Sequence, residues 1–416
     1  AMNDQALCFA GVDWASASHH VVLTDGDGRK IGERIFPHGG EGLAEMATWL
    51  IATSDAADAN HVLVAIEVPH GPVVETLLER GFPVHAINPK QMDRFRDRFA
   101  LAGAKDDCRD AEVMASALRT DRGCFRLLAV AEPVVIELRE WSRITDDLVA
   151  ERTRLTNRMR EQLWRYFPAM LELGGHLEAE WLLDLWELAP TPARAARLRA
   201  TTIEKLLKRH RIRRLDAAEV LAVLRQPPLT VAPGTTEAAC DHIATLMMRI
   251  RLVNRQIKNA HQRLDTLTAR LVPDAETKPG QEEQHDVAIL ASVPGIGRIV
   301  LATLLAEAFD PLQRRDYAAL RSLAGVAPVT KRSGKSCIVL RRYACNRRLA
   351  NAVYHWARTA TQHDSRSRAK YAALRARGHT HARALRSVGD RLLAVACSML
   401  KSGSVFAPSR ETAIAA

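Results

Sequence analysis

The sequence predicts an α/β N-terminal domain, a long helical coiled coil with a helical insert, and a mainly α-helical C-terminal domain. Three observations on the 416 residues predict this fold class: short apolar segments around an Asp-Gly turn near the N-terminus, heptad spacing in the middle, and helical segments around a Gly-x-Gly turn in the last third. At roughly 100–200 residues per domain, the length predicts two or three domains. We expect them at 6–125, at 130–275 with the insert at about 170–235, and at 286–405.

The first region has the pattern of three strands followed by alternating helices and strands. Residues 25–28, Asp-Gly-Asp-Gly, lie between two apolar segments, and a DG turn in this position is a strong hairpin signal. We expect strands at 7–13, 20–24, 30–36, 61–67 and 83–88, and helices at 42–51 and 72–80. The first three strands should be antiparallel.

The middle region is helical by its apolar spacing. One helix should run from about 134 to 167, where Pro168 ends it. In a second helix the gaps between apolar residues alternate between three and four: Ile243, Leu246, Ile250, Val253, Ile257, Ala260, Leu264, Leu267 and Leu271. This spacing is typical of a coiled coil, and a surface helix on a globular core is the alternative. We expect this seam to join two protomers.

A short glycine turn separates two helical segments of the last region. Val293-Pro294-Gly295-Ile296-Gly297 lies between them and gives the outline of a helix–hairpin–helix. Such a turn presents backbone N–H groups and a helix N-terminus to a DNA phosphate. The pattern is short, and a helical hairpin of any function can use glycine at its turn.

Charge is distributed unevenly along the chain, whose formal net charge is +11. Residues 1–125 hold 12 Lys and Arg against 19 Asp and Glu, whereas residues 286–416 hold 22 against 7. A basic segment of this size favours a polyanionic partner, most often nucleic acid. The alternative is a solvated basic surface without such a partner.

Seven cysteines are scattered along the chain without a CxxC pair. They predict free thiols in a reducing cytoplasm rather than disulfides or a zinc site. No apolar run approaches the ~18–20 residues of a membrane-spanning helix, and no export signal opens the chain. We therefore expect a cytoplasmic protein.

Four acidic residues of the first region could form a metal site. Asp13 and Glu67 end two expected strands, and Asp107 and Asp110 are three residues apart on one helical face. Their oxygens could hold two divalent cations, which stabilise the attacking and leaving oxygens at a phosphodiester. The alternative is that they are solvated ends of strands and of a helix, where Asp is common. Asp106 faces the other way and is expected to be a cap.

Several motifs resemble one family. GVDWA, AIEVPHG, AINPKQ and KDDCRDAEVMA resemble, in order, the RNase H/RuvC-like N-terminal domain of the DEDD transposases of the insertion sequence one-hundred-ten family. LASVPGIGRIVLATLLAE and LRSLAGVAPVTKRSGKS resemble the second, transposase domain of that family. The resemblance implies a nucleophilic serine at Ser333. It also implies catalytic residues that bind Mg²⁺: Asp13, Glu67, Asp107 and Asp110.

Ser333 lies within a run of basic residues. From 331 to 348 the chain has no acid, and we predict that its seven basic residues bind nucleic acid: Lys331, Arg332, Lys335, Arg341, Arg342, Arg347 and Arg348. A serine there would meet a phosphate already neutralised by cations. Without the resemblance, Ser-Gly is usually only a turn and the cluster a solvated basic face. Ser336 and Tyr343 are the competing hydroxyl groups nearby.

The resemblance implies a DNA recombinase that excises and integrates an insertion sequence through a covalent serine intermediate. It also implies donor and target DNA as partners, a structured guide RNA (the family's bridge RNA), and a homo-oligomer that is a dimer and becomes a tetramer on DNA. The alternative enzyme is a metal-dependent, RuvC-like junction-resolving nuclease that uses water. A further alternative is a nucleic-acid-binding scaffold without activity.

Overall fold

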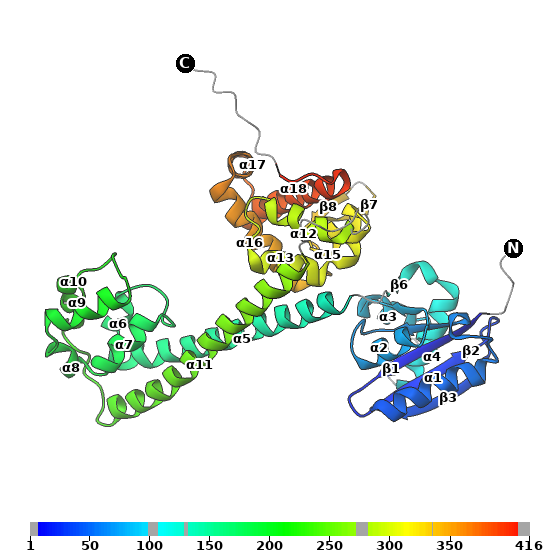
Figure 1. The fold of residues 1–416 in the computed structure, drawn as a ribbon, viewed down its shortest axis with the longest axis horizontal. Helices are drawn as coiled ribbons and strands as arrows, with labels where there is room; N and C mark the ends of the chain where they lie inside the picture. The colour runs from blue at the N-terminus through cyan, green and yellow to red at the C-terminus, as the bar shows by residue number, and fades with distance from the viewer. Residues whose placement is uncertain (1–6, 99–106, 129–131, 272–281, 335, 407–416) are drawn as a thin grey trace, which may run out of the picture. The chain divides into compact units, whose positions relative to one another are not determined.

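The computed structural model describes residues 7–98, 107–128, 132–271, 282–334 and 336–406 (Figure 1). Its contacts divide the chain into two compact units, 1–132 and 133–416. Within the described ranges, no helix is both long enough and apolar enough to cross a membrane.

Unit 1 is built on a six-stranded sheet with the order β3-β2-β1-β4-β5-β6. The strands are β1 (Cys8–Trp14), β2 (Ser18–Thr24), β3 (Lys30–Pro37), β4 (Val62–Ile66), β5 (Val84–Ala86) and β6 (Arg126–Leu127). The first three strands are antiparallel, β4 and β5 run parallel to β1, and β6 runs antiparallel to β5. The predicted α/β class and its five strands are confirmed, and β6 is an addition.

Helices cover both faces of this sheet. They are α1 (Gly40–Ser54), α2 (Pro72–Glu79), α3 (Pro89–Arg96) and α4 (Asp107–Thr120), with short 3₁₀ turns at Ala59–His61 and Arg122–Cys124. Successive residues of a strand point to opposite faces. Val12 and Ile66 therefore pack in a core with α1 and α2, whereas Phe9 and Ala65 pack in a second core with α3 and α4.

A glycine sets the distance between β1 and α4. A Cβ atom added to Gly11 would lie only 1.9 Å from the carbonyl oxygen of Ala111 and 2.9 Å from the amide nitrogen of Ala115. No side chain fits at position 11 unless the helix moves, because real Cβ atoms do not approach other atoms so closely. The first half of α4 is thereby held against the middle of the sheet.

Unit 2 begins with α5 (Pro133–Tyr166), which packs along α11 (Thr235–Arg270). The apolar residues of the predicted seam from Ile243 to Leu267 are buried, and their partner helix is α5 of the same chain. The expected pair of long helices is therefore present. The prediction that this seam joins two protomers is wrong, because its side chains are already covered within one chain.

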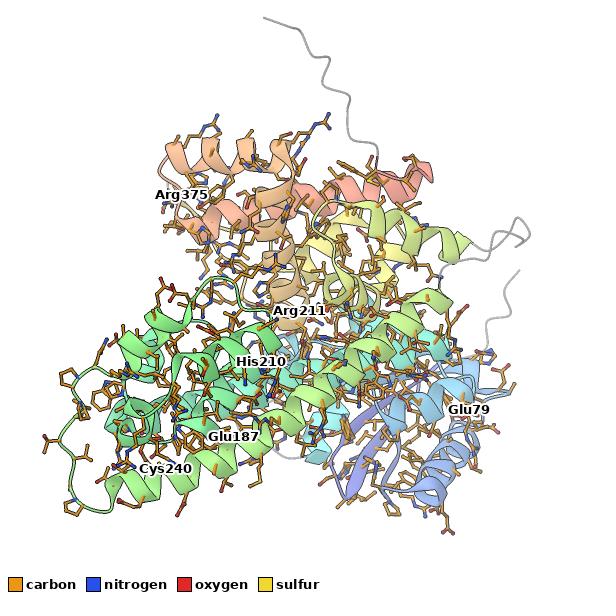
Figure 2. The ribbon with its side chains drawn as sticks, turned by 60° about the vertical axis from the view of Figure 1, so that its left-hand side comes forward. Glu79, Glu187, His210, Arg211, Cys240 and Arg375 are labelled. Carbon is orange, nitrogen blue, oxygen red and sulfur yellow. The ribbon has the colours of Figure 1, made fainter. Side chains whose placement is uncertain are left out.

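Five short helices between the two long ones form the helical insert: α6 (Ala169–Glu172), α7 (Glu180–Leu188), α8 (Pro192–Ala196), α9 (Ala200–Arg209) and α10 (Ala217–Leu224). Hydrogen bonds tie the insert to both long helices. The Tyr166 hydroxyl donates to the Pro190 carbonyl at 2.7 Å and accepts from the Trp186 indole at 2.9 Å. Cys240, labelled in Figure 2 near the start of α11, lies with its sulfur 3.3 Å from the same carbonyl.

The C-terminal part of unit 2 is mainly helical. Its elements are α12 (Glu282–Ser292), α13 (Arg298–Glu307), α14 (Phe309–Gln313), α15 (Tyr317–Leu323), β7 (Val329–Ser333), β8 (Ser336–Leu340), α16 (Arg347–His363), α17 (Ser365–Ala376) and α18 (His381–Ser402). Leu138 of α5 and Leu264 of α11 belong to the same core as Trp356 of α16. The long helices and the C-terminal helices thus form one packing unit, whereas the sequence predicted two domains there.

Ile250→Lys combined with Ile257→Lys should destabilise unit 2, because these side chains are 0% and 5% exposed and an unpaired ammonium group is costly to bury. For the double variant we expect a loss of at least about 3 kcal/mol in the free energy of unfolding, measured by urea denaturation with circular dichroism. The control, Leu252→Lys with Gln256→Lys, changes exposed positions of the same helix and should lose less than about 1 kcal/mol. Equal losses would contradict the intrachain seam.

Candidate functional site

Two predicted acids lie at the carboxyl ends of neighbouring parallel strands. Asp13 is the next-to-last residue of β1, and Glu67 directly follows β4. Because Val12 pairs with Ile66 in parallel register, Asp13 and Glu67 follow side by side at the same edge of the sheet. Asp13 also shares the strand face of Gly11, which α4 covers.

Asp110 reaches the same region from α4. It lies in the first turn of the helix, is 3% exposed, and directly precedes the Ala111 carbonyl that packs on Gly11. Arg96 of α3 forms a bidentate pair with Asp110, in which Nε donates to Oδ1 at 2.5 Å and Nη2 donates to Oδ2 at 2.9 Å. The hydrogen bond to Asp110 raises the pKa of Arg96, and the charge of Glu67 adds to this. Arg96 is thus a member of the site that the sequence analysis missed.

Asp107 begins α4 three residues before Asp110, but its side chain lies outside the part that the structure describes, and Asp106 lies outside it altogether. The structure therefore brings together Asp13, Glu67 and Asp110, and it adds Asp107 by helix position alone. Carboxylate oxygens are the donors that a hard divalent cation such as Mg²⁺ prefers, so this set fits one. A cation bound by Asp110 would compete with Arg96.

A second cluster lies on the same face, and the sequence analysis did not predict it. His20 stands opposite Asp13 in the antiparallel pairing of β1 and β2. The Cys108 thiol of α4 donates to Oε1 of Glu33 at 2.8 Å, and His20 Nε2 lies 2.9 Å from the same oxygen. Lys30 donates to Oε2 at 2.7 Å. These hydrogen bonds, chiefly the one from Cys108, hold the pKa of Glu33 at about 2.

Ser333 lies at the end of an exposed hairpin in unit 2. It is the last residue of β7 and stands opposite Ser336, the first residue of β8. Gly334 follows with a φ of +53°, which is the left-handed conformation that glycine adopts readily. The Ser333 side chain is exposed, and none of the described residues forms a hydrogen bond with its hydroxyl. Lys335 lies outside the described residues.

Four of the predicted basic residues are exposed. Lys331 and Arg332 lie on β7 beside Ser333, and Arg347 opens α16. The Arg341 guanidinium lies over the ring of Tyr343, 5.2 Å from its centroid. Such stacking keeps the cation at the surface while covering part of the ring.

The remaining basic residues have other partners. Arg342 donates to the Ala327 carbonyl at 3.3 Å. Arg348 forms ion pairs with Asp146 at 3.3 Å and Asp147 at 3.5 Å, so acids of α5 offset its charge. The seven residues predicted as one surface are therefore not equivalent.

Two arginines of α18 extend the basic surface, and the sequence analysis missed them because they come about forty residues later. Burial lowers the pKa of Arg386, and the neighbouring charges of Arg341 and Arg383 lower it further. Arg341 and Arg383 are therefore each close enough to Arg386 to repel it. An anion would relieve that repulsion.

The predicted glycine turn joins α12 to α13. Gly295 has a φ of +86°, and a Cβ there would lie 2.9 Å from the amide nitrogen of Ala360 in α16. The Trp356 indole of the same helix donates to the Pro294 carbonyl at 2.9 Å. This side of the turn is thus packed on its own chain, and only Gly297 and the N-terminus of α13 are exposed.

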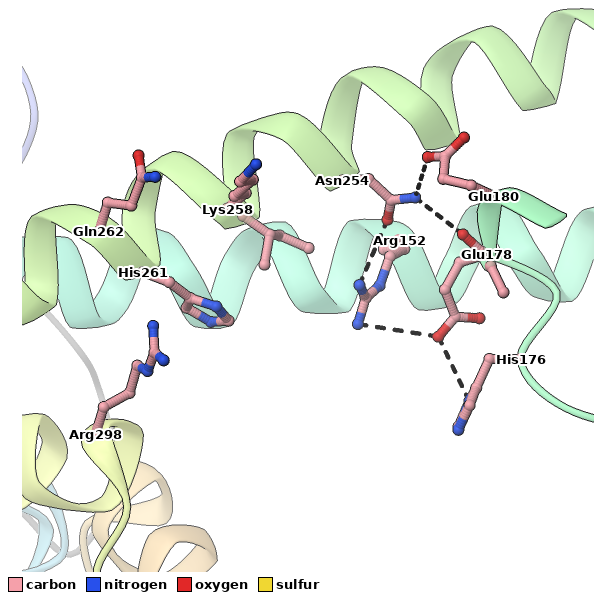
Figure 3. A pocket seen from close by; sticks show the side chains of 11 residues that line it. Arg152, His176, Glu178, Glu180, Asn254, Lys258, His261, Gln262 and Arg298 are labelled. Carbon is pink, nitrogen blue, oxygen red and sulfur yellow. Dashed lines mark hydrogen bonds and ion pairs between the residues drawn. The ribbon is translucent and has the colours of Figure 1, made fainter. Parts of the chain in front are cut away.

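An open pocket of about 620 Å³ lies between α5, α11 and the segment before α7 (Figure 3). Arg152 and His176 both contact Glu178 in its wall, while Lys258 and His261 extend from α11. Burial is the main cause that lowers the pKa of His261. None of the residues predicted for metal or nucleic-acid binding lines this pocket.

Comparisons with known proteins match both units. A family model described as "Transposase" covers residues 10–168, and one described as "Transposase IS116/IS110/IS902 family" covers residues 287–372. The first matched segment contains the four predicted acids, and the second contains Ser333 and all seven predicted basic residues.

Three similar proteins come from bacteria. "Putative transposase y4uE" of Sinorhizobium fredii is 78% identical over 216 residues, which are 52% of this chain and 60% of that protein. "Insertion element IS110 uncharacterized 43.6 kDa protein" of Streptomyces coelicolor is 28% identical over 96% of this chain and 95% of its own length. "Mini-circle putative transposase for IS117", also of Streptomyces coelicolor, is 32% identical over 94% of this chain and 93% of its own length. With similarity of this extent, the chain belongs to the IS116/IS110/IS902 family of transposases.

Proposed function

We propose that this chain is a DNA recombinase that excises and integrates an insertion sequence, with a Mg²⁺-binding carboxylate site in a RuvC-like unit 1 and a serine nucleophile in unit 2. The observation that carries the proposal is the parallel pairing of β1 with β4, which sets Asp13 beside Glu67 at the sheet edge. Asp110 on the helix above this edge supports it. Family membership supports the reaction on DNA.

In this proposal the four acids, Asp13, Glu67, Asp107 and Asp110, hold Mg²⁺. When bound there, Mg²⁺ would polarise the scissile phosphate and help an attacking hydroxyl to lose its proton. Arg96 offsets the charge of Asp110 and would release this carboxylate when the metal binds. The carboxylates thus hold and orient the metal ion, and they form no covalent bond with the DNA.

Ser333 would carry the covalent step. Its Oγ attacks the phosphorus and loses its proton, and the bond from phosphorus to a deoxyribose oxygen breaks. The products are a serine phosphodiester and a free DNA hydroxyl. A hydroxyl of the partner strand then attacks the same phosphorus, which restores the DNA bond and the serine without ATP. The exposed position of Ser333 between cationic residues supports this role.

One observation favours the alternative nuclease that uses water. The part of the chain that the structure describes supplies no base in contact with the Ser333 hydroxyl, and a serine without one is a weak nucleophile. In such a nuclease the carboxylate site would activate water, and the basic hairpin would only bind DNA.

We also propose donor DNA, target DNA and a structured guide RNA as partners. The net positive charge of residues 286–416 and the exposed hairpin support binding of phosphate backbones. Sequencing of RNA that co-purifies with the protein tests the guide. Recovery of one structured RNA species is expected, and bulk cellular RNA alone would contradict it.

The proposed assembly is a homo-oligomer, a dimer that becomes a tetramer on DNA. Because the seam is covered within the chain, another surface must supply the contact. The helix α11 exposes Met248 and Leu252, one turn apart, and α5 exposes Trp164. Light scattering with and without DNA measures the assembly.

Replacement of Asp13 by Asn, Glu67 by Gln or Asp110 by Asn should reduce DNA cleavage by more than about 100-fold. Loss of a residue that only supports a metal ligand costs up to about 100-fold, and these three acids are proposed as ligands themselves. Cleavage of a labelled duplex in Mg²⁺ is the measurement, with circular dichroism to confirm folding. Glu75→Gln removes the same charge from an exposed position of α2 and should keep activity, as should Asp106→Asn. Normal cleavage by the Asp13 variant would contradict the carboxylate site.

Ser333→Ala should keep Mg²⁺ and DNA binding and lose strand cleavage, because only one hydroxyl is removed from an exposed turn. The covalent protein–DNA adduct, detected on denaturing gels after quenching, should disappear with it. Ser336→Ala, across the hairpin, should retain both. Full cleavage by Ser333→Ala would show that water attacks the phosphate.

Arg341→Ala and Arg386→Ala should each weaken DNA binding for all sequences and reduce the slope of log affinity against log salt by about one. Fluorescence anisotropy at several KCl concentrations measures this slope. Arg348→Ala is the matched control, since Asp146 and Asp147 already offset its charge, and it should change the slope much less. Equal effects of all three variants would mean that DNA binding depends on the total positive charge, whether or not an arginine is paired with an acid.

A further inference from the structure

We propose that His20, Glu33 and Cys108 form a second metal site in unit 1, which binds one Zn²⁺ or a similar borderline-soft divalent cation. The three residues come from β2, β3 and the first turn of α4. Their ligand atoms, an imidazole nitrogen, a carboxylate oxygen and a sulfur, all lie within 4.8 Å of one another. The proposal concerns none of the four acids and does not rest on the recombinase reaction.

The donor types distinguish this cluster from the carboxylate edge. Oxygen donors suit Mg²⁺, whereas a set of sulfur, nitrogen and oxygen suits zinc. In a tetrahedral zinc site with bonds of about 2.0–2.3 Å, neighbouring ligand atoms are about 3.4 Å apart. Oε1 of Glu33 lies 2.8 Å from the sulfur of Cys108 and 2.9 Å from Nε2 of His20, so the cluster has only to open slightly to admit the ion.

The two carboxylate oxygens of Glu33 have different partners. Lys30 binds Oε2 of Glu33, which leaves Oε1 toward His20 and Cys108. On binding, Cys108 loses its thiol proton to solvent and coordinates as the thiolate, while His20 coordinates through Nε2 with its proton on Nδ1. The two negative ligands balance the charge of the cation. Water completes the tetrahedron, because the described residues supply three protein ligands.

The position of this site gives it a consequence for the neighbouring acids. Cys108 lies between Asp107 and Asp110 in the sequence, and His20 faces Asp13 across the strand pair. A cation held by Cys108, His20 and Glu33 would join the first turn of α4 to β2 and β3. It would thereby fix the part of the helix that carries two of the four acids, so its role is positioning.

Zinc binding to the full chain tests the proposal, with Mg²⁺ in excess and without DNA. We expect one Zn²⁺ per chain in competition with a chromophoric chelator. Co²⁺ in its place should give the near-ultraviolet thiolate charge-transfer band and the visible absorption of a tetrahedral site. Cys108→Ser, Glu33→Gln and His20→Ala should each lower zinc affinity at least about 10-fold. At the same Zn²⁺ concentration, the thermal midpoint should rise more in the wild type than in these three variants.

Matched variants distinguish a metal site from a cluster held by hydrogen bonds alone. The hydroxyl introduced by Cys108→Ser can still donate a hydrogen bond to Glu33, so a purely hydrogen-bonded cluster would tolerate it while a metal site would not. Cys124→Ser removes an exposed thiol elsewhere and should bind zinc like the wild type. Asp13→Asn should also keep zinc binding, even if it abolishes cleavage. Unchanged zinc affinity in Cys108→Ser, or Co²⁺ binding without a thiolate band, would overturn the proposal.

Discussion

The contact between Gly11 of β1 and Ala111 of α4 is the constraint on which the chemistry of unit 1 depends. It leaves no room for a side chain, so the helix lies directly on the strand. Asp110 precedes this contact by one residue and Cys108 by three. A larger residue at position 11 would lift the helix and separate both from the sheet. Cys108 would then lose its bond to Glu33, and Asp110 would leave the strand ends. One backbone contact therefore positions two polar clusters.

Charge balance is the second constraint at this edge. Carboxylates close together and partly buried repel one another and lose hydration, and a nearby cation must offset this. Arg96 offsets the charge of Asp110 through a bidentate ion pair, and Lys30 offsets the charge of Glu33. The two arrangements differ in strength, because Arg96 occupies both oxygens of a buried carboxylate, whereas Lys30 occupies one oxygen of a more exposed one. A cation at Asp110 must therefore displace a guanidinium, but a cation at Glu33 can bind beside the ammonium group.

The strands and the two acids at their ends could be predicted because they depend on local pattern. Short, largely apolar segments identify β1 and β4, and Asp13 and Glu67 follow from where those segments end. The partners that complete the site could not be predicted. Arg96 lies in a different helix from Asp110, and Glu33 meets Cys108 from seventy-five residues away, so both depend on tertiary packing that no periodicity encodes. The apolar seam of α11 shows the same limit, since its spacing predicts a partner helix but not which chain supplies it.

The basic segment shows the limit of counting charges along a sequence. The count overestimates the contribution of some residues to nucleic-acid binding and misses other residues. From 331 to 348 the chain holds no acid, yet Arg348 meets two acids that belong to α5. Arg386 lies outside that segment but close to Arg341 and Arg383, where burial and like charge destabilise its protonated form. A phosphate gains most where cations have no other counter-ion and are already partly desolvated. By that criterion the surface that best fits a nucleic-acid backbone is formed by the β7–β8 hairpin and α18, rather than by the start of α16. Ser333 lies on this hairpin, so the proposed nucleophile and the cations that would neutralise its target come from the same element.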